Sequence, residues 1–353
     1  MNNSSSIKEG TALNLTDYDY TNEFPAVCEY GTHASWFLPV LYSLFFVVGF
    51  PSNMLVLWVM LKGVQLKTMT DVSLVNLAIA DLLLILTLPF LAHYARDTWV
   101  FGNTMCTLVL SVYYIGFYAG IFFIVLMTTE RYLAIVHSLF AMRFRTKSLG
   151  SLASMIVWIV AVAASFPELL YLGVEPFEKE LLCSAYPKNK ESHNNVRSAA
   201  FIKMNVLGML IPLIIVGFCY AMVLRKLQSC PTSKKRAIRL VVVVMVVFFC
   251  CWIPYNIAAF LKVLELKGII PQKCDLSKNI QLMLQVTEAV AYSHSCLNPF
   301  LYVFVGEKFK RQFARLLLQT PCIHLQCMNR YLTRSAGSEH AQTRNVDKLS
   351  LAI

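Results

Sequence analysis

Carboxylates inside long apolar stretches are the residues of this chain with the clearest chemical meaning. Asp81 lies in the segment Asn-Leu-Ala-Ile-Ala-Asp-Leu-Leu, Glu288 lies in another apolar stretch, and Glu130 is followed directly by Arg131. A carboxylate at mid-membrane costs about 3 kcal/mol even on lenient insertion scales, so each one indicates either a buried pair or a function. A local ion pair would satisfy Glu130 and Arg131. For Glu288 we favour a ligand-facing anion that a cation reaches from outside, and buried pairing is the alternative for Asp81 and Glu288.

The composition indicates that a membrane surrounds these residues. Of the 353 residues, 57% are hydrophobic and 14% are charged, and the mean hydropathy is +0.57. Soluble domains average about 25% charged residues, so an ordinary water-soluble fold is excluded, as are disordered, collagen-like and coiled-coil chains. The sequence contains no nucleophile–base set, phosphate loop or metal-ligand spacing, so we expect neither an enzyme nor a cofactor. It predicts a polytopic membrane protein.

Seven stretches are long and apolar enough to cross a bilayer, which takes about 20 residues per helix. Barrel strands are shorter, about 10 residues, and alternate in polarity, so helices are favoured. The sequence therefore predicts an all-α bundle of seven transmembrane helices within residues 36–305. The expected spans are approximately Trp36–Leu61, Val72–Ala92, Met105–Thr128, Leu149–Leu172, Ala199–Leu224, Leu240–Leu261 and Ile280–Val305.

The basic residues orient the bundle. Lys and Arg number 19 in the connections and tail on one side and nine on the other. Because short cytoplasmic segments carry the excess of Lys and Arg, the N-terminus is expected outside and the C-terminus inside. Much of the net charge of +11 is this bias, so no nucleic-acid partner is needed to explain it.

The predicted extracellular tail, residues 1–35, is polar and acidic. It contains glycosylation sequons at Asn2, Asn3 and Asn14 and the run Asp17-Tyr18-Asp19-Tyr20. One interpretation is a solvated tail. The other is an acidic segment that captures a basic protein ligand, with Tyr18 and Tyr20 as sulfation sites, because opposite charges speed encounter.

The cysteines divide by side. Cys28, Cys106, Cys183 and Cys274 lie on the outer side, where disulfides persist. Four cysteines allow three pairings, and the sequence does not choose among them. Cys322 and Cys327 follow the last span, where a juxtamembrane cysteine can be palmitoylated.

Beyond the last span the chain changes character twice. Residues 306–318 carry apolar side chains at helical spacing with Lys and Arg between them, which predicts an amphipathic eighth helix lying on the membrane lipid. Residues 319–353 form a polar cytoplasmic tail. Its Ser and Thr residues are candidate phosphorylation sites for receptor kinases and arrestin.

These features resemble rhodopsin-like G-protein-coupled receptors over about residues 36–317. The resemblance rests on motifs that occur in order and on the correct side of the membrane. They are Asn53, Leu77-Ala78 with Ala80-Asp81, Glu130-Arg131-Tyr132, Trp158, Pro212 with Tyr220, Cys251-Trp252-Ile253-Pro254 and Asn298-Pro299-Phe300-Leu301-Tyr302.

Further motifs resemble the chemokine receptors, and the CC subgroup in particular. They include Thr87-Leu88-Pro89-Phe90, Trp99-Val100-Phe101-Gly102, Tyr113-Tyr114-Ile115-Gly116-Phe117-Tyr118 and His294-Ser295-Cys296-Leu297-Asn298-Pro299. The resemblance implies the disulfides Cys106–Cys183 and Cys28–Cys274. The chain departs from the pattern at Glu130, where the family usually has Asp, and at Leu91, where chemokine receptors typically carry Trp.

The resemblance also implies roles for individual residues. Ligand contacts would be Tyr18 and Tyr20 in the tail and Tyr42, Tyr113, Tyr255 and Glu288 in the bundle, with Glu288 meeting the positive N-terminal region of a basic chemokine. The coupling and switch residues would be Glu130, Arg131, Tyr132, Tyr220, Trp252, Pro254, Asn298, Pro299 and Tyr302. Asp81, Asn53 and Asn298 would form a polar cluster that can hold an allosteric sodium ion.

The sequence-based interpretation is a plasma-membrane receptor that binds a CC chemokine and activates a heterotrimeric G protein of the inhibitory class, driving chemotaxis and calcium signalling. A scavenger receptor with the same fold and no signalling is the alternative. A transporter is more remote, because the sequence contains no internal repeat or pair of broken helices.

Overall fold

The computed structural model describes residues 36–63, 66, 68–137, 146–166, 168–177, 180–185, 190–227, 233–271, 273–305, 309 and 312–316. The predictions at Asn2, Asn3, Asn14, Tyr18, Tyr20, Cys28, Cys322 and Cys327 lie outside the described residues, as do those for the tails 1–35 and 319–353. The side chain of Tyr302 is also outside the description.

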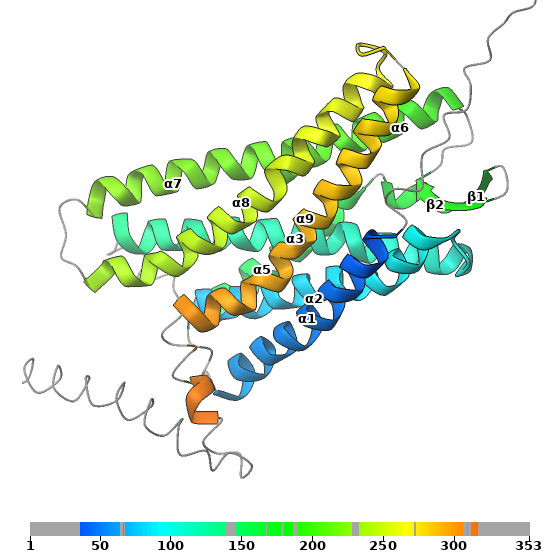
Figure 1. Cartoon of the computed structure of the whole chain (residues 1–353). Coiled ribbons are helices and arrows are strands. Elements are labelled where there is room, and N and C mark those ends of the chain that lie inside the picture. The colour runs from blue at the N-terminus through cyan, green and yellow to red at the C-terminus, as the bar shows by residue number, and fades with distance from the viewer. Residues whose placement is uncertain are drawn as a thin grey trace, which may run out of the picture.

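Long helices make up nearly all of the described chain (Figure 1). Two crossings contain a π-helical turn. In the first crossing α1 continues into η2, and in another α6 continues through η4 into α7. The elements are α1 (Leu38–Trp58), η2 (Val59–Gly63), α2 (Met69–Arg96), α3 (Gly102–Val136), α5 (Lys147–Ser165), α6 (Lys190–Asn205), η4 (Val206–Leu210), α7 (Ile211–Leu227), α8 (Ser233–Leu266) and α9 (Cys274–Val305).

The helices form a bundle of seven membrane-crossing rods. Six of them are long and apolar enough to cross a membrane on hydropathy alone. The seventh, α9, has 32 residues but carries Asp275, Lys278 and Glu288, which lower its hydropathy. It packs against α8, α1 and α2 inside the same bundle, so the predicted seven-helix architecture is confirmed.

The fourth crossing is shorter than the sequence predicts. We expected it to reach Leu172, but α5 ends at Ser165, and Phe166 has extended backbone angles (φ −81°, ψ 150°). Phe166 precedes Pro167, and the proline ring disfavours helical geometry in the residue before it. The helix therefore ends before this proline.

An unexpected β-hairpin lies on the outer side of the bundle, beside the start of α6 (Figure 1). Strands β1 (Leu172–Phe177) and β2 (Glu180–Ala185) pair antiparallel, with Val174 opposite Cys183. The disulfide Cys106–Cys183 fastens the hairpin to α3, with Cα atoms 5.6 Å apart. Apolar periodicity did not reveal these strands, because they lie outside the spans.

Glycines set the closest helix contacts. A Cβ atom on Gly150 of α5 would lie 2.9 Å from the Cα atom of Met69 in α2, and one on Gly116 of α3 would lie 3.2 Å from the backbone oxygen of Ala80. Small residues let membrane helices approach in this way. Both contacts bring a neighbour against α2, the helix that carries Asp81.

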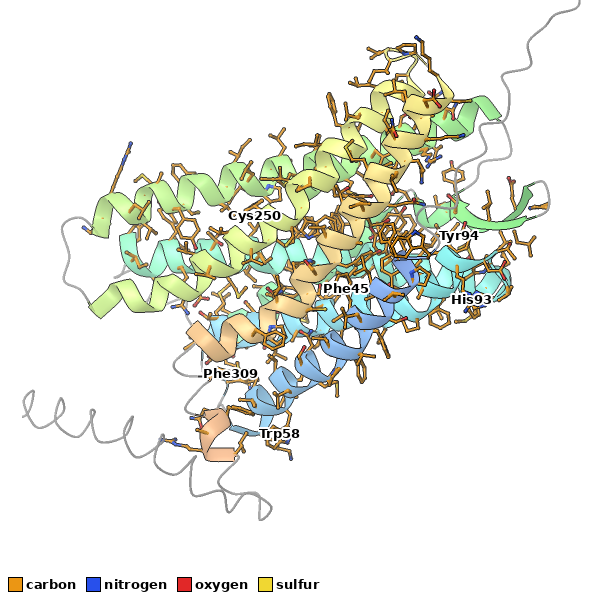
Figure 2. All side chains as sticks on the ribbon, in the orientation of Figure 1. Phe45, Trp58, His93, Tyr94, Cys250 and Phe309 are labelled. Atoms are coloured by element: carbon orange, nitrogen blue, oxygen red, sulfur yellow. A yellow bond between two sulfur atoms is a disulfide. The ribbon has the colours of Figure 1, made fainter. Side chains whose placement is uncertain are left out.

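The predicted eighth helix is described at Phe309 and residues 312–316, which are helical. Phe309 is buried against Val56 and Val59 at the inner end of α1, and it lies in the same region of the molecule as Trp58 (Figure 2). A Cβ atom on Gly63 would lie 2.9 Å from Leu316. This short helix therefore packs on the π-helical end of the first crossing.

Candidate functional site

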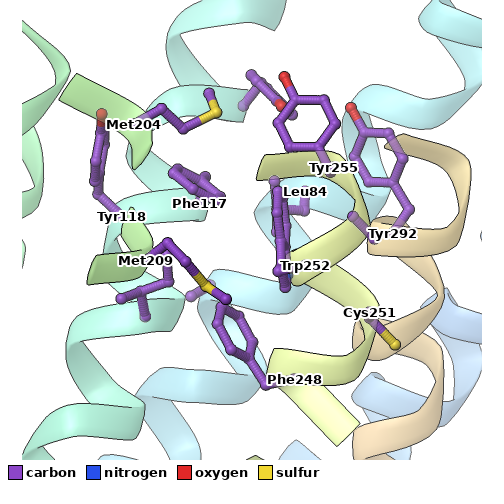
Figure 3. Packing of buried hydrophobic residues seen from close by; sticks show 14 of the residues in the cluster. Leu84, Phe117, Tyr118, Met204, Met209, Phe248, Cys251, Trp252, Tyr255 and Tyr292 are labelled. Carbon is purple, nitrogen blue, oxygen red and sulfur yellow. The ribbon is translucent and has the colours of Figure 1, made fainter. Parts of the chain in front are cut away.

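Trp252 lies at the centre of the bundle, where three helices meet. Its ring is 1% exposed and sits 4.6 Å from the ring centroid of Phe117 in α3 and 5.9 Å from that of Phe248 in α8. Figure 3 shows Trp252 between these rings and the tyrosines above it. Pro254 follows two residues later inside α8 and removes one backbone hydrogen bond there, so the helix can bend near Trp252.

A tyrosine cluster surrounds Glu288 in the outer half of the bundle; we define it as Tyr42, Tyr113, Tyr255 and Tyr292. The Tyr292 hydroxyl donates to Glu288 Oε1 over 3.4 Å. The Tyr292 ring lies 5.6 Å from Tyr42 and 6.0 Å from Tyr113. The structure thus brings together the ligand-contact residues expected in the bundle. Their four rings are buried, whereas Glu288 is half-buried.

Tyr292 is the member of this cluster that sequence reasoning missed. It follows Glu288 by four residues, which places both side chains on one face of α9. That spacing was a usable signal, because a phenol one turn from a buried carboxylate is a natural hydrogen-bond donor to it.

The tyrosine cluster contacts the central tryptophan directly. Tyr255 packs edge-on against Trp252 with ring centroids 5.7 Å apart. Tyr113 and Tyr255 lie within electrostatic reach of Glu288 and of each other. Contacts therefore run from the outer carboxylate through the cluster to Trp252, two residues before Pro254 in α8.

Below Trp252 the contacts continue to α9 and α2. The Trp252 indole N–H donates to His294 Nδ1 over 3.2 Å, and His294 Nε2 lies 3.7 Å from Asp81 Oδ1. His294 Nδ1 is also 2.5 Å from the Ala291 backbone oxygen. If Nδ1 carries the ring proton, it donates to Ala291; if it does not, it accepts from Trp252. His294 was not among the predicted site residues, although it lies one turn before Asn298.

The three residues of the predicted polar cluster are all buried in the bundle. Asn298 Nδ2 donates to Asp81 Oδ2 over 2.8 Å. Asn53 donates to the backbone oxygens of Gly49 and Ser295, both at 2.9 Å. Asp81 and Asn298 are each 1% exposed and Asn53 is fully buried. Helices α1, α2 and α9 therefore meet through polar groups that water does not reach.

The inner end of α3 carries Glu130 and Arg131. Glu130 is buried and accepts a hydrogen bond from the Thr70 hydroxyl of α2. Tyr220 of α7 has a buried hydroxyl without a hydrogen bond among the described residues and lies within electrostatic reach of Arg131. Tyr132 packs on Phe218, with ring centroids 5.9 Å apart. Thr70 was a further residue that sequence reasoning missed.

The outer disulfides frame the ligand side. Cys106–Cys183 is present as expected, and the Cys183 backbone N–H also donates to the Tyr94 hydroxyl over 3.2 Å. Tyr94 lies on the outer side, near His93 (Figure 2). Cys274, at the start of α9, is also disulfide-bonded; its expected partner, Cys28, lies outside the described residues.

The outer acid Glu288 is joined by packed rings to Trp252 in α8, and the inner end of α3 carries a Glu-Arg-Tyr motif. Residues 52–302 match the family described as 7 transmembrane receptor (rhodopsin family). Over 316 residues the chain is 41% identical to the C-C chemokine receptor type 3 of Cavia porcellus, covering 88% of this chain and 87% of that one. The identity to the Macaca mulatta receptor of the same name is 40% over 312 residues, or 87% of each chain.

This chain therefore belongs to the rhodopsin family of seven-transmembrane receptors and, within it, to the chemokine receptors of the C-C type. As in that family, it is a multi-pass protein of the plasma membrane.

Proposed function

We propose that the chain binds a basic CC chemokine at the cell surface and activates a heterotrimeric G protein of the inhibitory class, which drives chemotaxis and calcium signalling. The observation that carries the proposal is the run of contacts from Glu288, through the tyrosine cluster, to Trp252. A positive ligand group at Glu288 would act on these rings and so on α8 near Pro254, where the helix lacks one backbone hydrogen bond.

A population shift supplies the mechanism. The agonist shifts the equilibrium between the inactive and the active arrangement. The size of this shift is set by how much more tightly the agonist binds the active arrangement. In the active arrangement, the inner half of α8 moves outward and Arg131 contacts the G protein. The buried hydroxyl of Tyr220 is available to support Arg131 there, because it has no hydrogen bond among the described residues. Tyr302 and Pro299 of α9 are proposed to act in the same step.

The proposal extends to regulation from the inner side. Receptor kinases phosphorylate Ser and Thr residues within residues 319–353, and arrestin binds the modified tail. Palmitoylation at Cys322 and Cys327 anchors the segment that follows the eighth helix. Phe309, buried against the inner end of α1, supports a fixed starting point for that segment.

A sodium ion at Asp81, with Asn53 and Asn298 beside it, is proposed as an allosteric ligand. Buried oxygens support the fit, since Oδ1 of Asp81 and Oδ1 of Asn53 have no hydrogen-bond partner among the described residues. Space supports it too: a Cβ atom on the buried Gly120 would meet no atom within 4 Å. Gly120 lies one turn along α3 from Gly116, which packs on Ala80. The ion would neutralise the Asp81 carboxylate.

The test is G-protein nucleotide exchange in membranes that contain this chain, across a panel of CC chemokines. We expect exchange with one or a few chemokines, loss of exchange in Arg131→Ala, and weaker potency in Glu288→Gln. Inhibitory-class and other G proteins are assayed separately. Surface expression is checked for each variant with an antibody against an added epitope.

The remaining alternative, a scavenger receptor, predicts a different result. Chemokine binding and uptake would occur without nucleotide exchange for any G protein, and Arg131→Ala would change neither. Absence of both binding and exchange, from protein present at the surface, would refute the chemokine proposal.

A further inference from the structure

Arg197 is a second charged residue that faces the interior of the bundle on its outer side. It lies in α6, which begins near the outer hairpin and runs inward. Its guanidinium carbon is 5.9 Å from the ring centroid of Phe201, one turn deeper along the helix, and Phe201 packs against the central hydrophobic core. Residues four apart lie on the same face of a helix, so Arg197 and Phe201 both lie on the face of α6 that points into the bundle.

Arg197 and Glu288 act on the same tyrosines. Both charges lie within electrostatic reach of Tyr114 in α3 and Tyr255 in α8. Helix α8 packs against α6 on one side and α9 on the other. Tyr255 therefore lies on the helix between α6, which contributes the cation, and α9, which contributes the anion.

The other charged pairs near these tyrosines are internally neutralised. Lys203 contacts Glu168. Lys262 Nζ lies 2.9 Å from Glu265 Oε2, and Ser277 donates to the other oxygen of Glu265 over 2.5 Å. Neither Arg197 nor Glu288 forms an ion pair within the part of the chain that the structure describes. Both side chains are half-buried, so part of each remains accessible to a ligand.

We propose that Arg197 is a specificity-determining residue that binds an acidic side chain in the N-terminal segment of the ligand while Glu288 binds the ligand's cationic group. This inference rests on the proposed chemokine-receptor function and adds the class of ligand to it. A charge left unpaired inside a membrane protein is costly and marks a binding role by default. Guanidinium groups are suited to carboxylates, which they bind through two parallel hydrogen bonds.

Helix dimensions set the spacing of the two ligand charges. Axes of packed helices lie about 8–10 Å apart, so α6 and α9, one on each side of α8, are separated by at most about 20 Å. The long side chains of Arg197 and Glu288 reach inward and leave on the order of 10 Å between their charges. An extended peptide covers that distance in about three residues. The preferred ligand therefore carries Asp or Glu about three residues away from its cationic group.

The test compares paired ligands on paired receptors. Each CC chemokine of the panel is made in its natural form and in a form with every Asp and Glu before its first cysteine changed to the corresponding amide. Displacement binding is measured on the native receptor, on Arg197→Gln and on Lys273→Gln, a control that removes one exposed positive charge on the same side. Arg197→Lys, which keeps the charge, and surface labelling guard against misfolding.

On the native receptor and on Lys273→Gln, we expect the amide form to bind at least about tenfold more weakly than the acidic form. A loss of this size corresponds to the coupling measured between close charge pairs. On Arg197→Gln the two forms should bind equally. Arg197→Glu should in turn favour a ligand with Lys at the acidic position. Equal loss of both forms on Arg197→Gln, or no loss of either, would overturn the inference while leaving the chemokine function intact. Failure of every chemokine to bind any variant would refute both.

Discussion

Asn298 donates a hydrogen bond to Asp81 over 2.8 Å and so joins α9 to α2 at the middle of the membrane. Both side chains are 1% exposed. A buried acceptor that loses its donor costs about 1–3 kcal/mol. This bond therefore couples the helix that carries Glu288 to the helix that carries the central acid.

Asn298→Leu is expected to lower the stability of the bundle by about 1–3 kcal/mol, because it leaves Asp81 Oδ2 buried without its donor. Thermal unfolding in detergent measures the change. The exchanged double variant Asp81→Asn with Asn298→Asp restores a donor opposite an acceptor and should recover most of the loss. Equal stability of the single and exchanged variants would contradict this account.

Thr70→Val is expected to raise basal nucleotide exchange. The hydroxyl of Thr70 holds Glu130 against α2, and without it the carboxylate next to Arg131 is less fixed. Basal exchange without ligand, normalised to surface receptor, is the measurement. Thr70→Ser keeps the donor and should behave as the native chain; if Thr70→Ser rises as Thr70→Val does, the hydrogen bond is not the cause.

Gly150→Ala is expected to destabilise the receptor by about 1–3 kcal/mol, the usual cost of overpacking. The added carbon would lie 2.9 Å from the Cα atom of Met69, so backbone must move. Gly217→Ala is the matched control, since an added carbon there meets nothing within 4 Å. Thermal unfolding should separate the two variants, and an unchanged midpoint for Gly150→Ala would refute the close contact.

Lys203→Met is expected to cost about 3–5 kcal/mol, because it leaves the Glu168 carboxylate buried without its partner. Lys203 also donates to the Phe166 oxygen over 2.7 Å, at the end of α5. The double variant Glu168→Gln with Lys203→Met removes both charges and should be more stable than Lys203→Met alone. Yield of folded protein at the surface and the unfolding midpoint provide the comparison.

The number of crossings and their order follow from the amino-acid sequence alone. Apolar length decides both, since a bilayer admits a helix only if about 20 residues avoid charge. The same rule marked Asp81, Glu130 and Glu288 as exceptional, and all three lie among the contacts described above. Orientation also came from the sequence, through the distribution of Lys and Arg.

The contacts between residues of different helices, in contrast, become visible in the folded bundle. Thr70 with Glu130 and His294 with Trp252 join different helices, and no spacing along one helix predicts a partner on another. The hairpin of β1 and β2 was hidden as well, because strand pairing outside the membrane leaves no mark on hydropathy. The environment of Arg197 was hidden too: its charge is visible in the sequence, but only the packing of Phe201 on the core shows that its face of α6 points into the bundle.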